Sequence, residues 1–254
     1  MDTFSKAQTS PESARFHLSN QYVRIAISAA QAHEQGSHEL QAFLKTQLAY
    51  LHPTIGLPTE NAEGWLLDFV GTYIARVPDT LDRLQTLLCS SQVYDHGKVL
   101  MRIAQAFFCP SSEAPAQHHG LAKLMNEAYV IHRLAEEIHD RLTPPSTNPP
   151  PIENMLLANI VIHELLGEDF ANQLDLVVHY AVESLLQQDK ALNAAQAPVM
   201  QTSQTINTQS TECVNCPDFL SQYPIQLHLR NLHTSQDSGQ KPAPATTTLG
   251  HSRH

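Results

Sequence analysis

Apolar residues recur in this chain at intervals of three and four, and the prolines fall between the resulting segments rather than inside them. This spacing is the period of an α-helix, and a proline inside a helix would remove a backbone hydrogen bond. The clearest stripe consists of seven positions: Leu121, Leu124, Ala128, Ile131, Ala135, Ile138 and Leu142. The pattern predicts an all-α fold with a single domain of seven or eight helices, packed orthogonally or as a bundle.

The predicted helices follow one another between turn residues. They cover about 12–33, 37–51, 59–77, 79–88, 95–108, 121–142, 155–166 and 170–186. Gly36 is expected to end the first helix and Ser37 to cap the second. Large apolar side chains expected on the buried faces include Tyr22, Ile25, Trp65, Val99, Ile103 and Val177.

The composition changes along the chain and divides it into three parts. Residues 1–11 are expected to be a flexible N-terminus, and residues 12–192 the helical domain. Residues 193–254 are rich in Gln, Thr, Ser, Asn and Pro, and such a segment buries too little apolar surface to offset its ordering entropy. The sequence therefore predicts a low-complexity, mostly disordered tail with a possible small zinc-binding segment at 211–234.

Charge and cysteine content limit the binding partners and the cellular location that are expected for this chain. The net charge of −10 repels nucleic-acid backbones and anionic lipid headgroups, which makes nucleic acid a poor partner. The chain starts without the apolar region of a signal peptide, and its longest apolar run is too short to span a bilayer. Four cysteines are too few for a disulfide scaffold, and Cys89 and Cys109 are expected to be buried thiols. A cytoplasmic location is predicted.

The predicted tail contains two cysteines followed by two histidines. Cys213 and Cys216 have two residues between them, and His228 and His233 follow with four residues between them. Zn²⁺ prefers four such ligands in a tetrahedron, supplied as two short pairs. The segment resembles a two-cysteine, two-histidine zinc finger, and Phe219 and Ile225 resemble the small core of that family. The resemblance implies a structural zinc ion in the tail; DNA binding is not expected, because Arg230 is the only cation in the presumed helix.

A second candidate metal site lies in the helical part. His139 and Asp140 form a doublet that resembles the metal-binding His-Asp pair of the HD phosphohydrolases, which are also all-helical. Asp175 is the candidate downstream ligand, and an upstream ligand would come from His96, His118 or His119. This resemblance implies a metal-dependent hydrolase.

Two further patterns resemble the di-iron carboxylate bundles, whose sites combine Glu-x-x-His pairs with additional glutamates. Glu136 and His139 form one such pair, and Gly167 stands where a second histidine should follow Glu164. Asp175, His179 and Glu183 line one side of the last predicted helix at four-residue spacing. The alternative for these residues is an exposed polar face. His132 and His163 are expected to be hydrogen-bonded packing residues.

These patterns leave two classes of function open. The first is a non-catalytic helical protein that binds a protein partner, self-associates or acts as a regulator, because the chain has an even apolar stripe and no complete catalytic set. The second is a metal-dependent hydrolase or oxidase that uses core histidines and carboxylates. A Gly-x-Ser-x-Gly nucleophile motif is missing from the sequence. The first class is the preferred hypothesis.

Overall fold

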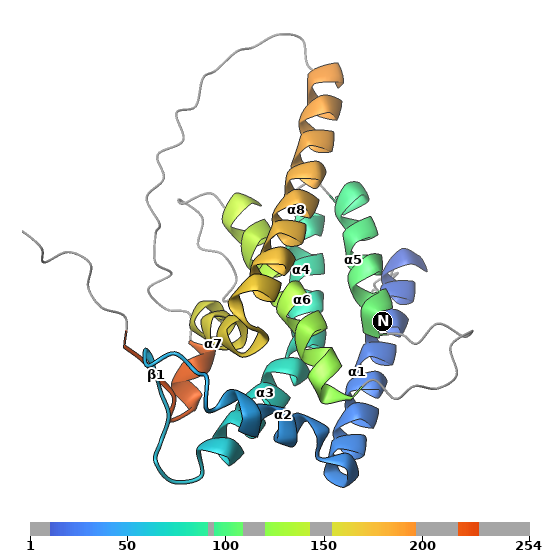
Figure 1. The fold of residues 1–254 in the computed structure, drawn as a ribbon. Helices are drawn as coiled ribbons and strands as arrows, with labels where there is room; N and C mark the ends of the chain where they lie inside the picture. The colour runs from blue at the N-terminus through green and yellow to red at the C-terminus, as the bar shows by residue number, and fades with distance from the viewer. Residues whose placement is uncertain (1–10, 91–93, 109–119, 143–153, 197–217, 229–254) are drawn as a thin grey trace, which may run out of the picture.

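The computed structural model describes residues 11–90, 94–108, 120–142, 154–196 and 218–228 (Figure 1). The elements in chain order are α1 (Pro11–Ser37), α2 (Glu39–Gln47), β1 (Ile55–Gly56), α3 (Ala62–Ala75), α4 (Val77–Ser90), α5 (Tyr94–Phe108), α6 (Leu121–Leu142), α7 (Leu156–Leu166), α8 (Glu168–Gln196), the 3-10 helix η1 (Phe219–Gln222) and β2 (Gln226–Leu227). Helices dominate, and β1 and β2 form a two-stranded antiparallel sheet. The prediction of an all-α single domain is confirmed.

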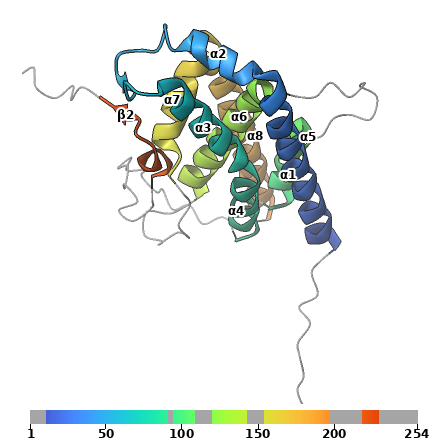
Figure 2. The same ribbon diagram turned by 90° about the horizontal axis from the view of Figure 1, so that it is seen from below.

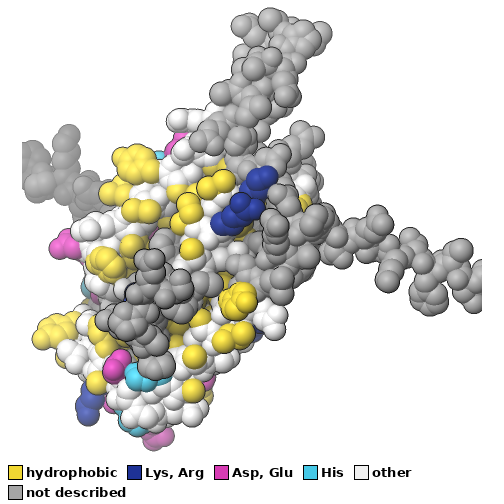
Figure 3. Space-filling view, turned by 90° about the vertical axis from the view of Figure 1, so that its right-hand side faces the viewer, with side chains coloured by type: hydrophobic (Ala, Val, Ile, Leu, Met, Phe, Trp, Pro, Cys, Tyr) yellow, Lys and Arg dark blue, Asp and Glu magenta, His cyan; other side chains and the backbone are white. Residues whose placement is uncertain are grey.

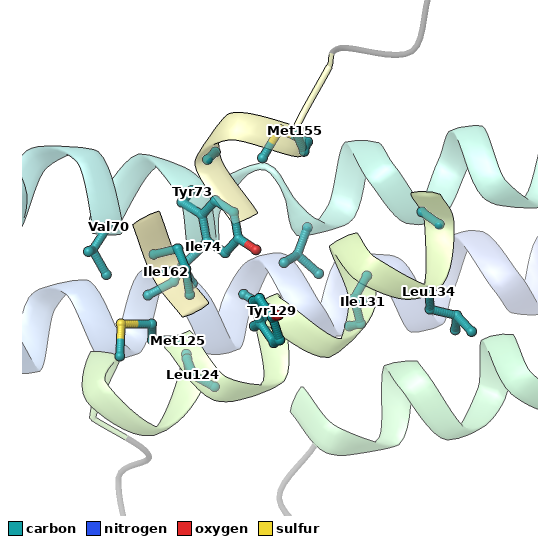
Figure 4. Packing of buried hydrophobic residues seen from close by; sticks show 14 of the residues in the cluster. Val70, Tyr73, Ile74, Leu124, Met125, Tyr129, Ile131, Leu134, Met155 and Ile162 are labelled. Atoms are coloured by element: carbon teal, nitrogen blue, oxygen red, sulfur yellow. The ribbon is translucent and has the colours of Figure 1, made fainter. Parts of the chain in front are cut away.

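Helix α6 is the centre of the domain, because it packs against each of the other α-helices. Figure 2 shows it among those helices in the view from below. Six of the seven stripe positions predicted on this helix are buried, and Leu142 at its end is partly buried. Figure 4 shows part of the core, where α6 (Leu124, Met125, Tyr129, Ile131 and Leu134) lies among side chains of α3 (Val70, Tyr73 and Ile74) and α7 (Ile162).

The junction of α1 and α2 differs from the prediction. Helix α1 continues through Gly36 to Ser37, and the chain turns at His38, whose φ is 54°. The cap of α2 comes from Glu34, whose two carboxylate oxygens accept hydrogen bonds from the backbone N–H groups of Leu40 and Gln41, each at 3.0 Å. A carboxylate at a helix N-terminus is favourable because the first N–H groups there lack partners within the helix. The prediction that Ser37 caps α2 is therefore wrong.

The boundary between α3 and α4 also moves. Helix α4 begins at Val77, so Pro78 lies in its first turn instead of ending α3. Proline is tolerated there because the first N–H groups of a helix have no intrahelical acceptor. The Pro78 carbonyl accepts a hydrogen bond from Asn20 of α1 at 3.0 Å. This contact joins the start of α4 to α1.

Several large apolar side chains that the sequence predicts to be buried lie on exposed faces of their helices. Those predicted buried but found exposed are Tyr22, Ile25, Trp65, Val99, Ile103 and Val177. Over residues 20–37 of α1, the buried side chains are Asn20, Val23, Ile27, Ala30 and Glu34, at spacings of three and four. Asn20 and Glu34 are polar and form hydrogen bonds, so counting apolar residues selects the neighbouring face. Cys89 is also exposed, which contradicts its prediction as a buried thiol, and Cys109 lies outside the described residues.

Helix α7 is apolar nearly all round and inserts into the core. Ala158, Val161, Ile162 and Leu165 are buried, whereas Leu156 and Ile160 are exposed. Gly167, with a φ of 85°, separates α7 from α8. Within the described ranges, no helix combines the length and the apolar character that a membrane span requires.

Residues 218–228, called here the docked segment, belong to the helical domain. Phe219, Leu220 and Ile225 are buried members of the hydrophobic core. The segment contains η1 and β2, and β2 pairs with β1 in the register Ile55–Leu227. The sequence analysis places these residues in the tail, because the composition of 193–254 as a whole conceals one short apolar cluster.

Candidate functional site

Helices α6 and α8 run side by side in the same direction and pair their polar side chains. The α6–α8 seam consists of Arg133, Glu137 and Arg141 on α6 and of Asp175, His179 and Glu183 on α8. Arg133 Nε donates to Asp175 Oδ1 at 3.0 Å, His179 Nδ1 lies 3.7 Å from Glu137 Oε1, and Arg141 pairs with Glu183. Residues four apart lie on one side of a helix, so each successive pair is about one turn further along both α6 and α8. The seam thus sets the relative register of the two helices.

Arg133 is shared by two carboxylates. In addition to Asp175, it donates through Nη1 to Glu136. Burial on its own would lower the pKa of Arg133, but Glu136 and Asp175 outweigh that effect and raise the pKa above its usual value. The guanidinium is therefore charged at any physiological pH, and the two carboxylates neutralise it.

A buried hydrogen-bond chain extends the seam inward. The Tyr73 hydroxyl donates to Asn159 Oδ1 at 2.7 Å, and Asn159 Nδ2 donates to Glu136 Oε2 at 2.8 Å. Tyr73 and Asn159 are 0% and 3% exposed, so water cannot replace these partners. The chain connects α3, α7 and α6 through groups that satisfy one another.

Tyr129 adds a second buried hydroxyl to the seam. Its hydroxyl donates to Asp175 Oδ1 at 3.0 Å. Burial raises the pKa of Tyr129, and the negative charge and hydrogen bond of Asp175 raise it further. Tyr129 is therefore a neutral donor and cannot act as a general base near neutral pH.

His132 lies on the opposite side of α6 and contacts Tyr73 through its ring. The two ring centroids are 4.4 Å apart. Nε2 lies 3.0 Å from the Tyr73 carbonyl oxygen, which only accepts, so Nε2 carries the proton and Nδ1 accepts from the Thr80 hydroxyl at 3.1 Å. Burial lowers the pKa of His132 to about 4. The prediction of a hydrogen-bonded packing histidine is confirmed at this position.

A cleft of about 430 Å³ opens over the seam. Its lining residues are Arg133, Glu137, Asn172, Asp175, Leu176, Val178 and His179. His163 of α7 lies close by, with Nε2 3.3 Å from Asn172 Oδ1 and 3.9 Å from Asp175 Oδ2. The charged groups that line the cleft are thus paired with one another, which favours a structural role for them over a catalytic one.

The structure places the three predicted core metal ligands in different surroundings. Asp175 belongs to the seam, where Arg133 and Tyr129 occupy its Oδ1 atom. His139 and Asp140 are on the last turns of α6, where burial and the neighbouring charge of Glu136 raise the pKa of the Asp140 carboxyl. Among the described residues, no three His, Cys, Asp or Glu side chains converge to hold one metal ion. The metal site at His139, Asp140 and Asp175 stays a prediction, and His118 and His119 lie outside the described residues.

The patterns that resemble a di-iron site have a direct structural explanation. Glu136 binds Arg133 and Asn159, and the row Asp175, His179 and Glu183 pairs with α6. The spacing within α8 indicates the row but not its partners on α6. A signal for these partners is present in the sequence, because Arg133 and Arg141 are eight residues apart, which matches the spacing of Asp175 and Glu183.

The part of the zinc-finger-like segment that the structure describes packs against the helical domain. His228 follows β2 directly, and its backbone N–H donates to the Thr54 carbonyl at 2.7 Å. Phe219 and Ile225, the expected finger core, are buried in the helical domain instead. The other proposed ligands, Cys213, Cys216 and His233, lie outside the described residues, so zinc binding stays a prediction.

Comparisons with known proteins do not assign this chain to a family. No protein-family model, no curated protein and no solved structure matches the chain. The residues described above are therefore the basis for any functional conclusion.

Proposed function

We propose that this chain is a non-catalytic helical protein that binds a helix of a partner protein along the outer face of α8. The observation that carries the proposal is the exposure of Leu176, Val177 and Tyr180, at 54%, 60% and 68%. Their spacings of one, three and four residues put them side by side within little more than one turn. Large apolar side chains gathered in this way mark contact surfaces on soluble proteins.

Uncharged polar residues continue this face of α8 on either side of the apolar group, and Glu183 borders it next to Leu176. Gln173, Ser184 and Gln187 are exposed and follow the apolar residues at helical spacing. The centres of protein interfaces are depleted of charged residues and enriched in tyrosine, which is the composition of this face.

The opposite side of α8 is held in place, which makes the outer face a rigid binding surface. Val178, Val182 and Leu185 are buried, and the seam pairs α8 with α6. A fixed surface loses little conformational entropy when a partner binds. A partner helix with apolar residues at intervals of three and four would complement the face, as in other helix-in-groove contacts.

A second group of exposed apolar side chains supports the proposal less well. Tyr22 and Ile25 come from α1, and Val99 and Ile103 come from α5. Figure 3 shows this side of the molecule, where Lys and Arg side chains lie among the hydrophobic ones. The group is drawn from two helices and is interrupted by charge, so it serves as the comparison surface in the experiment.

The test is to place a photoreactive amino acid at position 177 in the full chain and to cross-link it in the cells that produce the protein. The captured partner is then purified, and its affinity is measured for the unchanged chain and for Tyr180→Lys. We expect at least a tenfold loss of affinity, because a cation would be buried at the centre of the contact. Leu176→Lys should have a similar effect.

Ile25→Lys is the matched control, because it places the same charge on an equally exposed apolar position of another helix. It should leave the affinity unchanged. Equal affinities for Tyr180→Lys and the unchanged chain would contradict the proposal. The same conclusion would follow if cross-links from position 177 recovered only proteins that are also recovered from position 25.

A further inference from the structure

The docked segment is held by aromatic contacts with helix α3. The Phe219 ring lies 5.8 Å from the Phe69 ring and 6.3 Å from the Tyr73 ring, measured between centroids. Tyr223 packs edge-on against Phe69 at 5.3 Å. Phe219 is 0% exposed, so it fills its site completely. This is the arrangement of an anchor residue in a recognition site.

Backbone pairing fixes both ends of the segment. At one end the Phe219 N–H donates to the Asn154 carbonyl at 3.0 Å. At the other end β2 pairs with β1, and the His228 N–H donates to the Thr54 carbonyl at 2.7 Å. An extended segment that adds a strand to an exposed backbone edge and inserts side-chain anchors is a recurring mode of peptide recognition.

The segment also forms its own turn. The Asp218 carboxylate accepts from the Leu220 N–H at 3.2 Å, and the Tyr223 N–H donates to the Leu220 carbonyl at 3.0 Å. These bonds lie within the segment and do not depend on the helical domain. A turn that is formed before docking lowers the entropy lost on binding.

The chain connects this segment to α8 through residues 197–217. Figure 1 shows the C-terminal end of α8 at the opposite end of the molecule from η1. At 1.5 Å per residue α8 is about 40 Å long, and twenty-one residues reach up to about 70 Å. The connector is therefore long enough for docking within one chain, and the contacts themselves do not require the two parts to belong to the same chain.

We propose that the surface formed by α3, β1 and Asn154 is a peptide-binding site, that residues 218–228 are its ligand, and that a second copy of this chain can supply that ligand. Exchange of an identical segment preserves every contact, so it is a low-cost route to a dimer. A linker of about twenty residues between two parts of one chain gives an effective concentration on the order of millimolar, so the segment docks within its own chain in dilute solution. This inference does not depend on the proposed role of α8.

The test shortens the connector to a reach below the length of α8, which opposes docking within one chain. Deletion of residues 199–213 leaves six connector residues, with a reach of about 25 Å, which is shorter than α8. We expect the shortened chain to have twice the mass of one chain in reducing buffer, measured by light scattering after size-exclusion chromatography. Phe219→Ala in the shortened chain should return it to a monomer, and the chain with its full connector should be monomeric at the same concentration.

A peptide measurement covers the case in which the shortened chain does not fold. A fluorescent peptide of residues 217–229 should bind the full-length Phe219→Ala chain, whose own ligand lacks its anchor. It should bind the unchanged chain at least tenfold more weakly, because the site there is occupied. The same peptide with Phe219→Ala should bind neither chain.

A folded shortened chain that stays monomeric at every concentration would overturn the proposal. That holds even if the free peptide binds the Phe219→Ala chain, since the site would then accept a partner peptide but not a second copy. Failure of the peptide to bind the Phe219→Ala chain, with its helical content intact by circular dichroism, would show that the segment has no affinity as a separate ligand and would also overturn it.

Discussion

The α6–α8 seam and the docked segment attach an element to the same core by different means. In the seam, charged and polar side chains from two long helices pair once per turn, and most of them are partly exposed. In the docked segment, three buried apolar side chains (Phe219, Leu220 and Ile225) and backbone contacts at both ends hold eleven residues. Partly exposed ion pairs contribute little each, whereas a buried aromatic ring contributes several kcal/mol. The seam therefore distributes its energy over many positions, and the segment concentrates it in a few buried side chains, of which Phe219 is the largest.

Tyr73 of α3 lies between the two regions and connects to both. Its ring contacts Phe219 of the docked segment and His132 of α6, and its hydroxyl starts the hydrogen-bond chain that reaches Glu136 beside the seam. A change in the ring is expected to disturb the segment, and a change in the hydroxyl is expected to disturb the polar chain. This separation allows the two kinds of stabilisation to be measured independently.

The largest effect is expected from Phe219→Ala. Removal of a fully buried phenylalanine ring destabilises a protein by about 3–5 kcal/mol. Urea denaturation followed by circular dichroism should show that loss in the free energy of unfolding, up to the limit at which the segment no longer docks. Tyr50→Ala is the matched control, because Tyr50 is 76% exposed, and it should change stability by less than about 0.5 kcal/mol. A loss of similar size for both variants would mean that docking is not concentrated in Phe219.

The second effect is a loss of stability in acid caused by His132. The pKa of His132 is about 4 in the folded protein and about 6.5 in the unfolded chain. The unfolded chain therefore binds the proton first as the pH falls, and the folded state loses about 3 kcal/mol between pH 7 and pH 4. The loss is fully developed below pH 4. Its origin is the burial of the His132 ring against Tyr73 and Thr80.

His132→Gln retains a side-chain donor for the Tyr73 carbonyl and removes the titration. Between pH 7 and pH 4, the free energy of unfolding of this variant should fall by about 3 kcal/mol less than that of the unchanged chain. Urea denaturation at pH 7, 5.5 and 4 measures the difference. Exposed His179→Gln serves as the control. An unchanged pH dependence in His132→Gln would mean that His132 is protonated in the folded protein.

The third effect tests the polar chain without disturbing the docked segment. Tyr73→Phe keeps the ring that contacts Phe219 and leaves Asn159 Oδ1 buried without its donor. An unsatisfied buried acceptor costs about 1–3 kcal/mol. Thermal or urea denaturation should show this loss, and Tyr180→Phe, whose hydroxyl is on an exposed side chain, should be neutral. If Tyr73→Phe also released the docked segment, the two regions would not be separable at this residue.

The fourth effect concerns a carboxylate outside the seam. Glu127 lies on α6, and its Oε2 atom is buried without a hydrogen-bond partner. Burial raises the pKa of Glu127 to about 7, from 4.5 for an ordinary glutamate, although Lys123 acts in the opposite direction. The folded state is therefore penalised above pH 7, and the penalty disappears as the pH falls to 4.5. The seam carboxylates accept hydrogen bonds, whereas the buried Glu127 Oε2 atom has no hydrogen-bond partner among the described residues, so the two should respond to neutralisation in opposite directions.

Glu127→Gln should stabilise the protein at pH 8 by about 1 kcal/mol, a value reduced from the full pKa shift because part of the side chain is exposed and screened by water. At pH 4.5 the gain should be absent. Glu60→Gln, at an exposed position, is the control and should have no effect at either pH. Destabilisation at pH 8 would mean that Glu127 has a partner that its carboxylate needs.

The two regions also differ in how far the sequence predicts them. The buried stripe of α6 and the row Asp175, His179 and Glu183 follow from spacing alone, because both depend on residues of one helix. The partners of that row do not follow, since spacing within a helix does not identify the neighbouring helix. The buried face of α1 does not follow either, because the hydrogen bonds of the Asn20 side-chain nitrogen and of the Glu34 carboxylate go to residues far along the chain or beyond a turn. The docking of residues 218–228 does not follow from composition, because a composition averaged over the tail does not register a short apolar cluster such as Phe219, Leu220 and Ile225.

The smallest effect is expected at the exposed end of the seam. Arg141 pairs with Glu183 of α8 and with Glu137 one turn earlier, and its side chain is 35% exposed. The hydrogen bond to Glu183 raises the pKa of Arg141, so the ion pair forms at all pH values at which Glu183 is ionised. Pairs at this exposure contribute about 0.5 kcal/mol. A double-mutant cycle of Arg141→Ala and Glu183→Ala should give a coupling energy near that value.

Salt dependence separates the ion pair from the packing of the arginine stem. At 1 M NaCl the Debye length falls to about 3 Å, so the coupling between Arg141 and Glu183 should shrink while any loss from the stem persists. Arg83→Ala, at an exposed position of α4, provides the matched control for removal of a surface arginine. A coupling energy above about 2 kcal/mol that resists salt would show that the seam concentrates its energy as the docked segment does, and the contrast between the two regions would then be wrong.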